Sequence, residues 1–319
     1  MTYSHSKLMD TTRNVAPLLR PVYMLIAITS TAFHLIISIL SLKVFPFSWH
    51  VRIFYTYFFR YKLVNRSVPH STSQSLVVFQ STVFKTQVAM GEMDYFGHKS
   101  NSTYFLDMDF ARGHHIYGLF RDCARSYEAR YSTGATNCAG RFNFALGGTA
   151  CLFKRPILLF QNYEIWTRVC YWDEKWAYFV SHFVDAGIVK PHKFTDMQAG
   201  PRMNIRPETD EELRGDSQPT IYTVLVTKVV FKEGRKTIPP VEFFQAGGLL
   251  PTNIDHDMEI NDYETSQHEK EREEDRGYSL WSEIDQEKSK GQSTMESIIG
   301  LEDTMGLFDK DMKVAFRYY

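Results

Sequence analysis

An uncharged run of 22 residues near the N-terminus constrains this chain more than any other feature of its sequence. The run extends from Pro21 to Leu42, between Arg20 and Lys43, and has few polar interruptions. About 20 apolar residues suffice to cross the hydrocarbon core of a bilayer. A buried core helix is the alternative, although such helices usually carry a polar stripe, and a secretory signal peptide usually has a shorter apolar stretch. The sequence therefore predicts a single membrane anchor over residues 21–42.

The charges of the chain are unevenly distributed around this run. The 36 Lys+Arg and 37 Asp+Glu give a formal net charge of −1. Residues 1–80 nevertheless have eight basic side chains against one acidic, whereas residues 250–319 have eight against eighteen. This pattern excludes a uniformly basic nucleic-acid-binding protein, and we expect no nucleic-acid partner. It divides the chain into an N-terminal segment (1–20), the anchor (21–42), a juxtamembrane aromatic and basic segment (43–74), a globular domain (75–249) and an acidic C-terminal tail (250–319).

The juxtamembrane segment is rich in aromatic and basic residues between Phe45 and Tyr61. Such a composition is typical of a helix that lies at a membrane surface, and a helix packed on the globular domain is the alternative. Basic residues flank the apolar run on both sides, with a slight excess after it. Because positive charge is enriched on the cytosolic side of a membrane, this favours a single-pass protein with a cytosolic domain. An endomembrane such as the endoplasmic reticulum is compatible with that orientation.

The globular region reads as one helix combined with several strands. Apolar residues with helical spacing predict a helix from Asn101 or Ser102 to about Phe120. Alternating or apolar runs bounded by turn residues predict strands over 80–90, 142–153, 158–171, 176–184 and 220–231. Residues 186–218, which are polar and contain prolines and glycines, predict an extended loop. A helix with a mostly antiparallel sheet is an α+β arrangement.

The acidic residues 250–319 predict a loosely packed or disordered tail. Short helical pieces are expected around Trp281 and over 305–308. A cover over the substrate channel or a segment that binds a partner is the functional alternative for this region.

Three motifs in the globular region resemble those of one enzyme family. The first reads Asp94-x-x-Gly97-His98-x-x-Asn101-x-x-Tyr104, followed by Asp109-Phe110-Ala111-Arg112. The others lie at 159–176, with Asp173-Glu174-Lys175 as a tight turn, and at 231–240. Together they are similar to the hotdog-fold acyl thioesterases related to 4-hydroxybenzoyl-CoA thioesterase, and most similar to the membrane-anchored THEM6-like branch and its fungal relatives.

This resemblance implies a hotdog fold, in which the sheet wraps a central helix. It also implies that two chains pair as a homodimer with thioester sites at their interface. The implied substrate is an acyl thioester of coenzyme A or of a carrier protein. The chain has no GxSxG, P-loop or dinucleotide-binding motif, and its four cysteines and the pair His114-His115 lack metal-site spacing. We expect neither a metal nor a cofactor.

The first motif supplies the candidate site residues. The resemblance implies catalytic roles for Asp94, His98 and Asn101, and we expect Glu92, Gly97, Ser100 and Tyr104 to bind the substrate. Thioester hydrolysis needs a nucleophile or general base and a group that stabilises the developing oxyanion. Asp94 matches the first role, as nucleophile or base, and the backbone N–H groups of Gly97 and His98 could polarise the carbonyl.

Each of these residues also has an ordinary structural interpretation. Asp94 and Asn101 could cap the helix, a position that Asp and Asn often occupy. His98 could be an ordinary structural histidine, and Tyr104 could belong to the core with its hydroxyl paired. Gly97 instead supports a ligand site, because without a Cβ it permits close backbone approach to a ligand.

The family motif often has an aspartate at the position of Glu92 and an asparagine at that of Ser100. Both residues of this chain are still polar, but their side chains differ in length from those of the family.

These observations predict a membrane-anchored acyl thioesterase, acting in lipid or secondary-metabolite biosynthesis. The alternative from a different class is a non-catalytic hotdog module that binds acyl chains or scaffolds a membrane complex.

Overall fold

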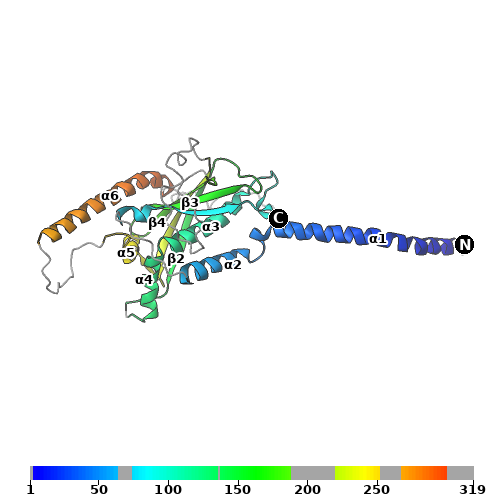
Figure 1. Cartoon of the computed structure of the whole chain (residues 1–319), viewed down its shortest axis with the longest axis horizontal. Helices are drawn as coiled ribbons and strands as arrows, with labels where there is room; N and C mark the ends of the chain where they lie inside the picture. The colour runs from blue at the N-terminus through cyan, green and yellow to red at the C-terminus, as the bar shows by residue number, and fades with distance from the viewer. Residues whose placement is uncertain (1–2, 64–73, 136, 188–219, 252–266, 300–319) are drawn as a thin grey trace, which may run out of the picture.

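An antiparallel sheet forms the centre of the structure, which is a computed structural model (Figure 1). It describes residues 3–63, 74–135, 137–187, 220–251 and 267–299. The helices of these ranges are α1 (Tyr3–Leu40), η1 (Leu42–Val44), α2 (Ser48–Tyr55), η2 (Thr56–Leu63), η3 (Gln74–Phe79), η4 (Met90–Glu92), α3 (Asn101–Gly118), α4 (Arg121–Ser132), α5 (Pro240–Ala246) and α6 (Gln267–Ile299). The strands are β1 (Thr82–Gln87), β2 (Phe142–Phe153), β3 (Asn162–Trp172), β4 (Ala177–Asp185), β5 (Ile221–Glu233) and β6 (Lys236–Ile238).

The strands pair in the order β1-β3-β4-β5-β2, and β6 pairs with β5. All of these pairings are antiparallel, which confirms the α+β class. The helix expected from Asn101 is α3, and the strand expected over 142–153 is β2. The strand expected from Leu158 begins later, at Asn162, because Leu158 instead forms an isolated bridge with His98 in the turn before α3. The predicted loop over 186–218 lies almost wholly outside the described residues.

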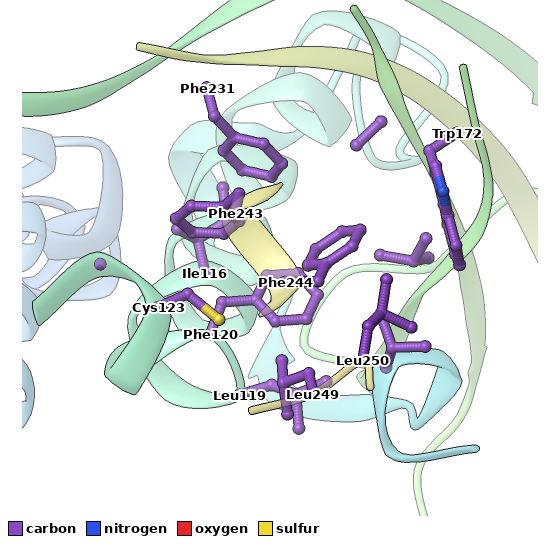
Figure 2. Close-up of a cluster of buried hydrophobic side chains, with 14 of the residues drawn as sticks. Ile116, Leu119, Phe120, Cys123, Trp172, Phe231, Phe243, Phe244, Leu249 and Leu250 are labelled. Atoms are coloured by element: carbon purple, nitrogen blue, oxygen red, sulfur yellow. The ribbon is translucent and has the colours of Figure 1, made fainter. Parts of the chain in front are cut away.

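The main core lies between one face of the sheet and helices α3, α4 and α5. Side chains from α3 and the start of α4 meet Phe231 of β5 and two phenylalanines of α5, Phe243 and Phe244 (Figure 2). The rings of Phe231 and Phe243 are stacked with their centroids 3.9 Å apart. Burying such aromatic rings is the largest contribution that a side chain makes to a core.

The opposite face of the sheet is also covered, by α6 within the acidic region 250–319. The expected loose packing is corrected for this helix only, because residues 252–266 and 300–319 lie outside the described residues. Most of β4 is buried on both faces: Phe179 belongs to the main core, while Tyr178 and Val180 pack with Met295 of α6. Ile284 of α6 is fully buried with the main core. The part of α6 whose side chains are described, residues 279–296, is therefore docked, because Ile284 and Met295 cover apolar surface that would otherwise be exposed. The helical piece expected over 305–308 lies outside the described residues.

Helix α1 extends away from the rest of the structure as a single rod (Figure 1). Its residues Arg20–Leu40 form one helix that is long and apolar enough to cross a membrane, and none of that stretch is buried in the protein. A buried core helix is therefore wrong for this segment. The helix ends at Leu40, two residues before the expected end of the anchor, and the chain then turns through η1.

The juxtamembrane segment packs on the globular domain, as the second of the two alternatives for it supposed. Tyr61 of η2 is fully buried in the main core, and the guanidinium of Arg52 in α2 lies 3.7 Å from the ring centroid of Phe110 in α3. Such a cation over an aromatic face is attractive. Helix α3 is thus enclosed between the sheet and the segment that follows the anchor.

The docking of α6 can be tested by truncating Ile284. We expect Ile284→Ala to lower the free energy of unfolding by about 3 kcal/mol, because it removes buried methylene groups and leaves a cavity. The exposed neighbour Gln286 supplies the control, since Gln286→Ala should change that free energy by less than about 0.5 kcal/mol. Urea unfolding followed by circular dichroism measures both, and equal effects of the two substitutions would show that α6 is not docked.

The burial of His115 in α3 predicts that the folded protein becomes less stable in acid. It is fully buried, its Nδ1 lies 2.9 Å from Oγ1 of Thr82, and burial lowers its pKa to about 3. Between about pH 6.5 and 3 the unfolded chain binds a proton that the folded chain does not, so stability falls as the pH falls through this window. We expect His115→Gln to make the pH dependence of the unfolding free energy shallower by up to about 1.4 kcal/mol per pH unit. Urea titrations at a series of pH values measure this slope, and an unchanged slope would contradict the assignment.

Candidate active site

The candidate site is a tight turn between β1 and α3 that Asp94 holds together. Its Oδ1 accepts hydrogen bonds from the backbone N–H groups of Phe96, at 2.9 Å, and His98, at 3.1 Å. The backbone N–H of Asp94 donates to the carbonyl of His98 at 2.8 Å, and that of Gly97 donates to the carbonyl of Asp94 at 3.2 Å. A carboxylate that accepts two backbone N–H groups fixes the local chain. Asp94 therefore caps its own turn rather than helix α3.

These bonds correct the expected roles of two donors. The N–H groups of Gly97 and His98 were expected to polarise a substrate carbonyl, but both already donate to Asp94. Gly97 has a φ of 82°, which a residue with a Cβ adopts only with strain, and a Cβ there would meet no atom of the described chain. The backbone conformation of the turn thus accounts for this glycine. Its expected approach to a ligand stays a prediction.

The start of α3 presents the other polar residues of the motif. Ser100 is the N-cap, but its side chain makes no capping bond, and its Oγ lies 3.2 Å from that of Ser102. Asn101 is the first residue of the helix and is exposed, whereas His98 is partly buried. The expected catalytic residues Asp94, His98 and Asn101 therefore lie on one turn and the helix start that follows it. Their catalytic roles stay predictions.

Tyr104, one turn into α3, lies in a second core cluster between the helix and the sheet. Its ring centroid is 5.2 Å from that of Phe153 in β2 and 5.4 Å from that of Phe183 in β4. Burial raises the pKa of the Tyr104 hydroxyl above its ordinary value. Tyr104 packs behind the turn, so its expected contact with substrate would require the acyl chain to enter this cluster.

Beneath the turn lies a cluster of three buried charges and one partly buried lysine, which we call the ion cluster: Glu92, Lys99, Asp107 and Lys43. The Nζ of Lys99 lies 2.9 Å from Oε1 of Glu92 and 2.7 Å from Oδ2 of Asp107. The Nζ of Lys43 lies 2.9 Å from Oε2 of Glu92 and 2.9 Å from Oδ1 of Asp107. The hydroxyl of Tyr163 in β3 also donates to Oδ2 of Asp107. Two positive and two negative side chains therefore balance one another with little contact with water, since only Lys43 is partly exposed, by 14%.

The ion cluster shifts the titration of its members. Burial alone would raise the pKa of Asp107, but the ammonium groups of Lys43 and Lys99 hold it below its ordinary value. Burial lowers the pKa of Lys43, opposed by the carboxylates of Asp107 and Glu92. Buried charges are tolerated only when they are paired and hydrogen-bonded in this way.

The position of Glu92 follows from the ion cluster. Its side chain is completely buried, and both carboxylate oxygens are bound by lysines. Its Oε2 also accepts the backbone N–H of Ala89 at 2.8 Å, and its carbonyl accepts the N–H of Ser100. Glu92 therefore supports the turn from beneath in this structure, and its expected role in binding substrate stays a prediction.

Sequence reasoning missed three members of the ion cluster: Lys43, Lys99 and Asp107. One signal was available, because Asp107 precedes Met108 on the apolar side of the predicted helix, where an unpaired carboxylate would be costly. Lys43 gave no such signal, since it is separated from Asp107 by 64 residues and reads as a charge that flanks the anchor. In the described part of the chain, no group of three or more His, Cys, Asp or Glu side chains could hold a metal ion.

Comparison with known proteins identifies relatives of this chain. Residues 88–242 match the thioesterase-like superfamily. The thioesterase poxG of Penicillium oxalicum is 32% identical over 222 residues, covering 67% of this chain and 69% of that protein. The protein THEM6 of Danio rerio is 33% identical over 109 residues, covering 34% and 47%. A probable thioesterase structure from Bartonella henselae covers 50% of this chain and 98% of that one, at 10% identity and a TM-score of 0.32. The sequence matches confirm the resemblance that the motifs carry.

The ion cluster predicts that replacing Lys43, three residues after the end of α1, strongly lowers the stability of the protein. We expect Lys43→Met to lower the free energy of unfolding by about 3 kcal/mol, because it leaves two buried carboxylates with one lysine. The double variant Lys43→Met/Glu92→Gln should recover part of this loss, since it restores charge balance. Lys154→Met, at an exposed lysine, is the control and should have an effect below about 0.5 kcal/mol. Thermal and urea unfolding of the wild type, the single variants Lys43→Met and Glu92→Gln, the double variant and the control measures the cycle, and additive losses of the two single substitutions in the double variant would contradict the pairing.

Proposed function

Because the chain belongs to the thioesterase-like superfamily of hotdog-fold thioester hydrolases, we propose that it hydrolyses an acyl thioester with Asp94 as general base or nucleophile. The observation that carries this role is the orientation of the Asp94 carboxylate. Its Oδ1 is held by two backbone N–H groups, and among the described residues no hydrogen bond reaches Oδ2. A half-buried carboxylate with one oxygen fixed and the other free is suited to act on a ligand.

As a general base, Asp94 takes a proton from water on Oδ2 while the water oxygen attacks the thioester carbonyl carbon. The tetrahedral intermediate then expels the thiolate, which takes up a proton, and the products are a carboxylic acid and a thiol. As a nucleophile, the carboxylate attacks the carbonyl carbon and expels the thiolate to form an anhydride, which water hydrolyses. Trapping with hydroxylamine distinguishes the two routes, because only attack on the anhydride leaves a hydroxamate on the side chain of Asp94, whereas an acyl hydroxamate also forms from the thioester itself.

The developing oxyanion needs donors other than the N–H groups of Gly97 and His98. The first turn of a helix has N–H groups without intrahelical partners and carries a partial positive charge. We assign this role to the N-terminus of α3, with the exposed amide of Asn101 as a further donor. We assign the protonation of the leaving thiolate to His98, whose backbone N–H donates to Asp94 in the same turn.

We infer a homodimer from the open edge of the sheet at β2. Strand β2 lies at the end of the strand order and pairs with β5 on one side only within the described residues. Exposed apolar side chains lie along it, at Leu146, Leu152 and Phe153. A long edge strand with apolar side chains favours pairing with another chain. A second copy on β2 would place the two candidate sites beside their shared interface.

The membrane part of the proposal rests on α1. Its apolar stretch is exposed along its whole length, so a bilayer is the environment that would remove it from water. The enzyme would then be a single-pass protein of an endomembrane with its domain in the cytosol, acting on acyl-CoA or on an acyl carrier protein. The alternative, a non-catalytic module that binds acyl chains, is favoured by one observation: the bonds of Asp94 Oδ1 are those of a purely structural residue.

Thiol release from acyl thioesters tests the catalytic role of Asp94. We expect the full chain in detergent or lipid to release thiol from members of an acyl-CoA panel, and Asp94→Asn to reduce kcat by about 100-fold or more, because the amide keeps the turn bonds but is neither base nor nucleophile.

Asp173 supplies a matched control for that substitution. Its Oδ1 also accepts two backbone N–H groups, those of Lys175 and Trp176, in the β3–β4 hairpin. Asp173→Asn should therefore retain activity. A panel on which wild type and Asp94→Asn are equally inert, with both folded, would favour the non-catalytic module.

A further inference from the structure

The end of the domain from which α1 leaves carries an exposed surface of apolar side chains, which we call the apolar rim. Its members are Phe47, Met93, Tyr95, Phe96, Leu158 and Phe160. Tyr95 is 90% exposed and Phe96 is 67% exposed, and their rings lie with centroids 4.0 Å apart. Large apolar side chains gathered on one surface usually mark a contact with another molecule or with a membrane.

Hydrogen bonds join the segments of the apolar rim around the candidate site. Met93, Tyr95 and Phe96 flank Asp94 in the turn. Residues 157–160 lie against this turn: the N–H of Lys99 donates to the carbonyl of Ile157 at 2.9 Å, and His98 forms a bridge with Leu158. The rim therefore borders the turn that carries Asp94.

The rim is also fixed against the end of α1. A Cβ on Gly91 would come within 2.3 Å of the side chain of Val44, so the turn packs directly on the chain that follows the anchor. The Nζ of Lys43 donates to the carbonyl of Gln87 at 3.0 Å and joins Glu92 in the ion cluster. Because these contacts leave the turn beside the last residues of α1, a bilayer spanned by α1 would meet the rim (Figure 1).

Backbone conformation gives an independent indication that two rim residues serve a purpose outside the domain. In the described chain the non-glycine residues with positive φ are Phe47, at 66°, and Phe160, at 61°. Bulky residues rarely adopt this conformation, and strained positions concentrate at functional sites. Both rings are exposed, Phe47 by 75%, so packing within the domain does not explain the strain.

Basic residues accompany the apolar ones. Lys154 and Arg155 are exposed in the same loop as Leu158 and Phe160. Aromatic side chains combined with Lys and Arg are typical of surfaces that lie in a headgroup layer, where the basic groups attract anionic lipids. A second copy of the chain is the competing occupant, but the proposed dimer contact is β2, and a basic pair beside exposed phenylalanines suits lipid better.

We propose that the apolar rim, with Lys154 and Arg155, lies in the headgroup layer of the membrane that α1 spans, so that Asp94 receives acyl thioesters from the bilayer. This rests on the proposed membrane-anchored thioesterase and narrows its substrate class to thioesters whose acyl chain partitions into lipid. The substrate's acyl chain would leave the bilayer between Phe96 and Leu158 without crossing bulk water, while its polar thiol portion stays in the headgroup layer.

Spin labels at single introduced cysteines, with the buried Cys123 and Cys170 left in place, test the position of the rim in the full chain. The protein is reconstituted in nanodiscs of phosphatidylcholine and phosphatidylserine, with Cys138 and Cys151 replaced by serine, and labelled at Phe96→Cys. We expect the label to be more accessible to oxygen than to a water-soluble nickel chelate. Ile28→Cys in α1 is the control for insertion, and Tyr131→Cys in α4, at the end of the domain away from α1 (Figure 1), is the aqueous control.

The outcomes separate the rim from the anchor. If the label at Ile28 is more accessible to oxygen and the label at Phe96 is more accessible to the nickel chelate, α1 is in the bilayer but the rim is not. This result overturns the proposal for the rim and agrees with the proposed anchor. Aqueous readings at both positions overturn the anchor and the rim together. A label at Phe96 that is shielded from both reagents and shows dipolar broadening assigns the surface to a second copy of the chain, which also overturns the proposal.

Activity measurements test the basic pair. We expect Lys154→Gln/Arg155→Gln to reduce kcat/KM several-fold for a long-chain acyl-CoA in vesicles that contain phosphatidylserine, and to leave it unchanged for a soluble short-chain acyl-CoA. The wild type should also lose this several-fold advantage when phosphatidylserine is omitted. An equal loss on both substrates would show that the pair binds the phosphates of coenzyme A, and would overturn its assignment to lipid.

Discussion

The ion cluster is the interaction on which the rest of the structure depends. It joins Lys43 after the anchor, Glu92 and Lys99 in the turn, and Asp107 on α3, all with little or no contact with water. Removing one charge from such a group leaves another buried without a partner, which costs far more than a surface pair contributes. The turn that presents Asp94 is therefore held in place by electrostatics beneath it as well as by its own hydrogen bonds.

This constraint ties the end of α1 to the domain. Lys43 lies three residues after the end of α1, and its ammonium reaches both carboxylates of the ion cluster. Tyr61 and Arg52 of the following helices pack on α3 and the core. A boundary drawn at residue 75, where strand periodicity begins, would separate side chains that support the candidate site from the turn that they support. The short connection also determines how far the site can lie from a membrane.

Much of the fold could be predicted because local patterns carry it. The spacing of Tyr104, Met108 and Ala111 predicted α3, and the apolar run of 142–153 predicted β2 with the same bounds. Helix α6 could not be recognised in the same way, because its composition is acidic and only a few side chains, such as Ile284 and Met295, dock. The missed signal lies elsewhere, in β4, whose side chains are apolar on both faces and so require a cover on each.

The sequence by itself determined the length of the apolar stretch and the positions along the chain of α3 and the main strands. It also determined the motif from Asp94 to Tyr104, and through these features the family. These features depend on residues that are close together in the chain. The tertiary structure alone decided that Lys43 joins Asp107, that the N–H groups of Gly97 and His98 are occupied, and that the exposed aromatic residues gather beside α1. Such contacts are set by how distant segments pack, because the free energy of a buried charge or an exposed ring depends on neighbours that local sequence does not specify.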